Sequence, residues 1–357
     1  MKKVYIFLLV AIMLVLVGCG DDSQQTDEKN EPVEEAVASE STEDEETEKE
    51  EEPEPEEEPE KEEEPVYNGP VSVTTGLPID DENAASKRFS IMIENSPKAR
   101  PHTGLVNADV VYEMHVEGLV TRFLAIYSDD IPEKIGPARS SRHYYLPVAE
   151  SWDIPYIHYG GSPQAYAKFP TLSVPRIDGI YSGKHFKRDT SRRAPHNAYF
   201  YTEPLDPIEN QPVNNKFEFD KEATYDQTQP ATTLDIRYNN FTHVAYEYDS
   251  EANVYKRSLE GNPHADRVTG EQIKASNIIV MYAKHNVIPG DTAGRINITL
   301  SGQGDAQFFF NGEVVEGMWK NESGNIRYYV NGEVIKLQPG KTWVQVVNTT
   351  KRDTVSY

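Results

Sequence analysis

The chain has little cysteine, since Cys19 is the only one among 357 residues. A single thiol excludes internal disulfides and metal sites built from several cysteines. The apolar run at 4–17 is shorter than the roughly 18–20 residues of a transmembrane helix. The nine histidines have no HExxH or paired spacing, no G-x-S-x-G motif occurs, and no glycine-rich loop carries a phosphate-loop lysine. We therefore predict no metal and no cofactor, and stability from packing alone.

Cys19 closes a short segment at the start of the chain. Lys2 and Lys3 precede the 14-residue apolar run, and the small Gly18 comes directly before the cysteine. This order is typical of a cleaved export signal and resembles a bacterial lipoprotein signal over residues 1–19. The resemblance implies that Cys19 is diacylated, and two acyl chains anchor a protein stably. We expect lipid anchoring on the outer face of the cytoplasmic membrane; an incidental cysteine is the alternative.

Residues 20–66 follow as an acidic, proline-bearing segment. Between 21 and 64 there are 24 acidic residues and three lysines, a net charge of −21. Such a segment cannot bury enough apolar surface to offset its ordering entropy, so we predict a disordered tether. It could act as a spacer or bind a basic partner or cations. The chain's −24, less this −21 and the +2 of Lys2 and Lys3, leaves −5 for 66–357. That charge gives no ground for nucleic-acid binding.

The rest of the chain divides into two regions with different sequence patterns. Region 67–212 alternates strand-like apolar runs with short helical patterns, which predicts an α/β or α+β domain around a mixed sheet. Its expected strands are 89–93, 109–116, 122–127 and 154–159. Ser162-Pro163 predicts the start of a helix through Lys168, and a second helix at 143–152 is weakened by Pro147.

A mainly-β domain is predicted at 238–357, after a polar linker at 213–237. Asn311-Gly312 and Asn331-Gly332 each lie between apolar runs, a strong signal for type I′ hairpins. Further strands are expected at 278–282, 296–300, 308–310, 326–330 and 343–347.

Three polar segments in the first domain could bind an anion. Paired arginines match phosphate or carboxylate oxygens, glycines let a backbone approach a ligand closely, and a basic loop adds positive charge. The candidate residues are Arg139, Ser140, Ser141, Arg142, Tyr159, Gly160, Gly161, Ser162, Arg192, Arg193, His196 and Asn197. The alternatives are arginines that pair with acids to orient loops, a tight strand-to-helix turn, and a solvated basic loop.

Catalytic groups are less clearly indicated. Asp109 and Glu113 are the candidate carboxylates, and Glu113 is expected to share a strand face with Glu117. Such spacing is common, and counter-ions for the arginines explain these residues better. Ser140 or Ser141 lies too close in sequence to His143 to form a triad with it.

A resemblance extends over most of residues 70–350. Segments such as Arg88–Asn95 (RFSIMIEN) and Lys134–Arg142 (KIGPARSSR) resemble the YerB-like family of Gram-positive lipoproteins. Further matching segments are 100–105, 108–113, 117–118, 121–124, 159–162 and 193–197, and then 261–264, 317–320 and 337–346 in a separate C-terminal domain. Glu94 and His102 stand where Asp and Gln are expected. The resemblance implies a lipid-anchored, two-domain protein, but no catalytic residues, because the family's function is unknown.

Three functions remain open at this point. The first is a non-catalytic binding or scaffolding module for an anionic ligand, with wall polymer or an envelope protein as a partner. The second is a cell-wall enzyme acting on pyrophosphate-lipid or glycopolymer substrates, suggested by a faint similarity to LytR-CpsA-Psr transferases. The third is a protein-binding β domain that presents Trp319, Tyr328, Tyr329 and Trp343, although packing in the core explains these rings better.

Overall fold

The computed structural model describes residues 67, 69–79, 88–205 and 217–357. The signal segment, Cys19 and all of the predicted tether lie outside these residues. Glu64–Tyr357 forms one compact unit. None of the helices in the described part of the chain has the length and apolar character needed to cross a membrane.

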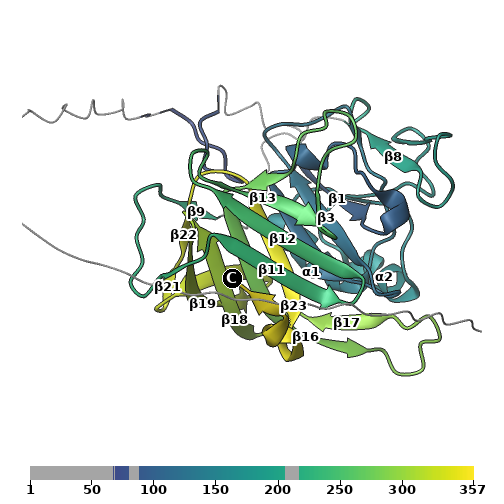
Figure 1. Cartoon of the computed structure of the whole chain (residues 1–357). Coiled ribbons are helices and arrows are strands. Elements are labelled where there is room, and N and C mark those ends of the chain that lie inside the picture. Colours follow the sequence, from purple (N-terminus) through teal and green to yellow (C-terminus); the bar gives the residue numbers. More distant parts are fainter. Residues whose placement is uncertain (1–66, 68, 80–87, 206–216) are drawn as a thin grey trace, which may run out of the picture. The chain divides into compact units, whose positions relative to one another are not determined.

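A large mixed sheet organises the fold (Figure 1). Within the described residues it contains thirteen strands. Its order is β21 (Glu333–Val334), β20 (Asn325–Val330), β19 (Glu313–Glu322), β18 (Gln303–Phe310), β16 (Asn277–Val287), β23 (Thr342–Asn348), β2 (Val110–His115), β3 (Thr121–Tyr127), β1 (Phe89–Glu94), β5 (Tyr156–His158) and β6 (Arg176–Asp178). β10 (Gln229–Pro230) pairs with β19, and β17 (Ile296–Thr299) with β16.

Strands from both predicted domains lie in this sheet. β23 pairs in parallel with β16 on one side and with β2 on the other, from Val110↔Thr342 to Met114↔Val346. A strand near the C-terminus therefore joins the two halves. The two predicted domains therefore do not form separate sheets. Their boundaries along the chain remain a prediction.

The strand directions place several ends at one edge of the sheet. β1, β2, β5 and β6 run parallel, and β3 runs antiparallel between β1 and β2. The carboxyl ends of the four parallel strands thus meet at the same edge as the start of β3, where Glu94 pairs with Arg122. We call this the carboxyl edge. In open α/β sheets ligands bind outside this edge.

The two faces of the sheet have different cover. α1 (Leu146–Trp152) and α2 (Pro163–Lys168) contribute to the core on one face. The other face packs against a second sheet of six described strands: β14 (Asn262–Pro263), β13 (Val254–Leu259), β12 (Thr242–Asp249), β11 (Thr233–Asn239) and β24 (Val355–Ser356), with β15 (Lys274–Ala275) beside β13. Tyr112 and Met114 face the helices, and Val111 faces the second sheet, because side chains alternate along a strand.

Smaller elements complete the described residues. β4 (Lys134–Ile135), β8 (Ala198–Tyr201) and β7 (Phe186–Arg188) form a three-stranded sheet, and β22 (Lys336–Leu337) pairs with β9 (Glu218–Phe219). Short 3-10 helices are η1 (Pro97–Ala99), η2 (Leu105–Asn107), η3 (His143–Tyr145), η4 (Phe169–Thr171) and η5 (Thr349–Thr354).

The predicted fold class is confirmed: the first half has a mixed sheet with few helices, and the second half is mostly strands. Both Asn-Gly hairpins have positive φ at their two central residues, as type I′ turns require. The Ser162 hydroxyl accepts a hydrogen bond from the Ala165 N–H and caps α2. The helix expected at 143–152 begins only at Leu146, with Pro147 in its first turn, where the missing N–H has no helical partner.

Candidate functional site

Two of the predicted polar segments run side by side at the carboxyl edge. The Arg139 N–H donates to the Met92 carbonyl at 2.9 Å, so residues 139–142 continue beside the end of β1. The Tyr159 N–H donates to the Arg139 carbonyl at 3.0 Å, and the Ser141 N–H to the Gly160 carbonyl at 2.9 Å. Gly160 has φ of 75°, which lets the chain turn there after β5. Segments 139–142 and 159–162 therefore form one surface.

The third predicted segment joins them through side chains. Arg139 Nη1 lies 3.4 Å from the Pro195 carbonyl oxygen. His196 Nδ1 lies 2.9 Å from Oε1 of Glu94, the last residue of β1. Residues 192–197 thus reach the carboxyl edge. All three segments meet although up to about sixty positions separate them in sequence.

Arg142 and Arg122 share one carboxylate. Arg142 makes a two-pronged ion pair with Glu117: Nε lies 2.8 Å from Oε2, and Nη2 bonds Oε1. Arg122 Nη2 lies 3.8 Å from the same Oε1. Burial raises the pKa of Glu117, but the hydrogen bond and charge of Arg142, together with the charge of Arg122, bring it down to about 2. Burial, followed by the charge of Arg142, lowers the pKa of Arg122 to about 10.

Glu94 is the second carboxylate of the site. Its Oε1 accepts hydrogen bonds from Ser96 Oγ at 2.8 Å and from His196 Nδ1. Arg139 Nε lies 3.6 Å from the same oxygen. Glu94 Oε2 is buried and, among the described residues, has no hydrogen-bond partner; the same holds for Nε of Arg122 and of Arg139. Buried polar atoms normally have partners, so this concentration marks a place where another group can bind.

The charges here do not cancel. We use the name arginine cluster for Arg122, Arg139 and Arg142 with Glu94 and Glu117. Three guanidinium groups face two carboxylates in it, which leaves one positive charge before His196 is counted. Nearby, Arg188 lies over the ring of Tyr159 at 5.1 Å and donates to its hydroxyl. Arg193 is exposed. A cluster of this charge attracts anions.

Several predicted residues instead hold the loops in place. Arg192 donates to the carbonyls of Ala99 and Pro101 at 2.6 and 2.7 Å. Asn197 Nδ2 donates to the carbonyls of Asp189 and Arg192. The other members with such contacts are Ser140, which donates to the Tyr159 carbonyl, Ser141, which accepts from the Tyr156 hydroxyl, Gly161, which bridges to Ser141, and the helix cap Ser162. Such contacts support the alternative interpretation, in which these residues orient loops and turns.

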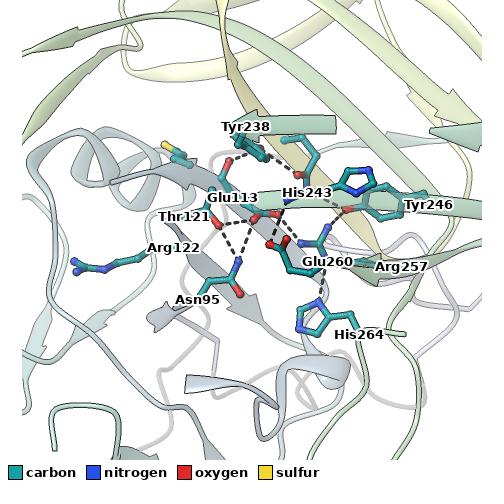
Figure 2. A network of polar contacts seen from close by, with 12 residues as sticks. Asn95, Glu113, Thr121, Arg122, Tyr238, His243, Tyr246, Arg257, Glu260 and His264 are labelled. Atoms are coloured by element: carbon teal, nitrogen blue, oxygen red, sulfur yellow. Dashed lines mark hydrogen bonds and ion pairs between the residues drawn. The ribbon is translucent and has the colours of Figure 1, made fainter. Parts of the chain in front are cut away.

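The candidate catalytic carboxylates are not brought to the arginine cluster. Asp109 comes before β2, at the opposite edge, where burial and then the charge of Asp129 raise its pKa to about 7. Glu113 lies in the middle of β2 and is fully buried. Its Oε2 lies 2.7 Å from Arg257 Nη2, and its Oε1 accepts from Thr121 (Figure 2). Figure 2 also shows Arg122 pointing away from this network.

The expected pairing of Glu113 with Glu117 does not occur. Glu113 binds Arg257 of the second sheet, whereas Glu117 lies beyond the end of β2 and binds Arg142. The alternation that places even-spaced residues on one face stops where the strand stops. Among the described residues, no group of three or more His, Cys, Asp or Glu side chains comes together as a metal site would need.

Three members of the arginine cluster were not predicted as anion-site residues, and Glu117 was considered only as a partner of Glu113. Glu94 could be recognised only as a carboxylate near a strand end, and Arg122 lies inside a strand. They face each other across the β1–β3 pairing. Only the register of that pairing brings them together, and no local sequence motif encodes it.

Comparisons with known proteins agree with this architecture. Residues 74–216 match the family described as "Protein of unknown function (DUF3048) N-terminal domain", and residues 234–344 match its C-terminal domain. "Putative lipoprotein YerB" of Bacillus subtilis (strain 168) is 33% identical over 283 residues, covering 76% of this chain and 85% of the relative. The crystal structure of the YerB protein from Bacillus subtilis matches with a TM-score of 0.71 and 30% identity, over 80% of this chain and 98% of that one. The chain therefore belongs to the YerB-like family, whose two domains it contains.

Proposed function

We propose that this protein is a lipid-anchored envelope protein that binds an anionic ligand at the arginine cluster. Anchoring at Cys19, on the outer face of the cytoplasmic membrane, is supported by the signal-like residues 1–19 and by the name of the YerB relative. The ligand carries phosphate or carboxylate groups, because guanidinium forks match their oxygens.

One observation carries the binding proposal. Three separate polar segments converge on the carboxyl edge, and the site they form keeps one positive charge in excess. Arg142 is fully engaged by Glu117, so it positions the site. Arg139 is the residue available to a ligand, because its side chain is 25% exposed and lies 3.6 Å from a Glu94 oxygen that two other donors share.

The protein-binding alternative loses its original support. Trp319, Trp343 and Tyr328 are 2%, 1% and 2% exposed, and Tyr329 is also buried. These rings pack in the core and do not present an interface.

The test uses the full chain purified in detergent. Thermal unfolding is followed with inorganic pyrophosphate, polyphosphate or citrate for the wild type, Arg139→Gln and Arg327→Gln. Arg327 is an exposed arginine on β20, toward the other end of the sheet order, and matches the charge change. We expect an anion-induced rise in Tm that Arg139→Gln loses and Arg327→Gln keeps, and that weakens with salt. Equal shifts in all three proteins, or none, contradict the proposal.

A further inference from the structure

His196 differs from three of the most deeply buried histidines of the described chain. His102, His158 and His264 each use both ring nitrogens in hydrogen bonds, and burial lowers their pKa values. The His196 side chain is 19% exposed and uses Nδ1 alone. Among the described residues none hydrogen-bonds its Nε2. This imidazole therefore keeps one nitrogen for chemistry.

Glu94 fixes which nitrogen that is. An ionised carboxylate only accepts hydrogen bonds, so Nδ1 of His196, 2.9 Å from Glu94 Oε1, carries the proton. In the neutral imidazole, Nε2 then keeps its lone pair. Glu94 is itself held firmly, since its side chain is 5% exposed and its backbone carbonyl accepts from His102 Nε2 at 2.7 Å. A buried carboxylate that orients an imidazole in this way is the arrangement of a general base.

We propose that His196 is the general base of a phosphodiester hydrolase, with Glu94 as its positioning residue and Arg139 binding the substrate. The inference rests on the proposed anion site. The arginine cluster's single excess charge matches the single charge of a phosphodiester. A second observation points to the same place: Glu94 Oε2 is buried without a partner among the described residues. The attacking water, bound beside a phosphodiester at Arg139, can therefore donate a hydrogen bond to this oxygen.

The reaction balances with water as the only co-reactant. His196 Nε2 takes a proton from water as the water oxygen forms a bond to phosphorus. The bond from phosphorus to one ester oxygen breaks, and that oxygen leaves with the electron pair and gains a proton from solvent. The proton on Nε2 then returns to solvent. The products are an alcohol and a phosphomonoester, while Arg139 holds a non-bridging oxygen throughout.

Hydrolysis of bis(p-nitrophenyl) phosphate by the full chain in detergent, with EDTA present, tests the proposal. The variants are His196→Gln, Glu94→Gln, Glu94→Asp and the control His243→Gln. His243 also pairs with a carboxylate, Asp235 at 2.6 Å, but on the second sheet. We expect His196→Gln to lower kcat at least about 100-fold and His243→Gln to leave it unchanged.

Glu94→Gln separates orientation from structure. An amide can donate to Nδ1, which moves the proton of His196 to Nε2 and removes the base. We expect the activity to fall as in His196→Gln, to return partly in Glu94→Asp, and ¹⁵N NMR to show the change of tautomer. Wild type no faster than His196→Gln, or a His196 tautomer protonated at Nε2, overturns the inference. If pyrophosphate still raises the Tm of such an inactive protein, the proposed anion binding stands without catalysis.

Discussion

Arg257 is a fully buried arginine with a partner for each of its nitrogens. Nη2 binds Glu113, Nη1 donates to the Tyr246 hydroxyl at 2.8 Å, and Nε donates to His264. Its guanidinium lies 4.3 Å from the ring centroid of Trp343. A buried charge is tolerated only when it is paired and hydrogen-bonded, so this residue depends on Glu113, which lies in the other sheet.

Replacing Glu113 by Ala should leave the Arg257 charge buried and unpaired. We expect the free energy of unfolding to fall by about 3–5 kcal/mol, measured by urea denaturation. The double variant Glu113→Leu/Arg257→Met removes both charges and should lose less than Glu113→Ala alone. A double variant that is less stable than the single one would show that the pair does more than neutralise itself.

Asp109 should make stability depend on pH. Burial, reinforced by the charge of Asp129, raises its pKa from 3.8 to about 7, so the native state keeps a proton that the unfolded chain releases. This contribution is complete below pH 4 and is lost as the pH rises toward 7. Asp109→Asn should flatten the decrease in unfolding free energy between pH 4 and 7, measured by urea denaturation across that range. Equal slopes for wild type and variant would refute this.

Residue types alone indicated half of the candidate site. Arg139 could be picked out because it is paired with Arg142 around two serines, and His196 because it lies in a basic loop. Glu94 and Arg122 could not be assigned to it, because only the pairing of β1 with β3 places them opposite each other. Likewise, the sequence places Arg142 beside serines but cannot show that Glu117 occupies its guanidinium.

At the scale of elements, short sequence patterns were sufficient to predict strands and turns that depend mainly on neighbouring residues. The β-branched and aromatic runs predict β1, β2, β3 and β5 to within two residues at either end. The two Asn-Gly turns are equally well determined, because only a few residue types accept positive φ at both central positions. The two hairpins then differ in their surroundings, which sequence does not reveal.

Gly312 and Gly332 make a matched pair for substitution. A Cβ at Gly312 would lie 2.8 Å from Tyr248, whereas a Cβ at Gly332 would meet nothing within 4 Å. Gly332→Ala should therefore lose only the backbone strain of positive φ, roughly 1–2 kcal/mol. We expect Gly312→Ala to lose more, measured by thermal and urea unfolding. Equal losses would mean that Tyr248 moves aside freely.

At the scale of the whole molecule, the arrangement of the sheet could not be predicted. The parallel pairing of residues 110–114 with 342–346 links segments more than two hundred positions apart. The sequence pattern correctly separates an α/β half from a β half, but it does not determine the order of the strands in the sheet. The sequence predicts two domains joined by a linker, but β23 pairs with strands of both halves and joins them in one sheet.

Because β23 lies between β16 and β2, the described unit should unfold in one transition. Removing residues 339–357 takes away β23, and we expect this truncation to abolish protection from hydrogen exchange in β2 as well as in β16. The control removes only 355–357, which include the edge strand β24, and should keep both protected. A truncated chain that still protects β2 would show that the first half folds independently.

The position of β23 also determines when the large sheet can be completed during synthesis. Synthesis begins at the N-terminus, so β1, β2, β3 and β5 exist long before Thr342–Asn348 is made. Until then β2 has an unpaired edge, and such edges invite wrong strand pairing. The first half of the protein therefore cannot finish folding while the second half is still being synthesised. It must keep that edge protected until Thr342–Asn348 is made, and a chain that stops before β23 leaves the middle of the sheet open.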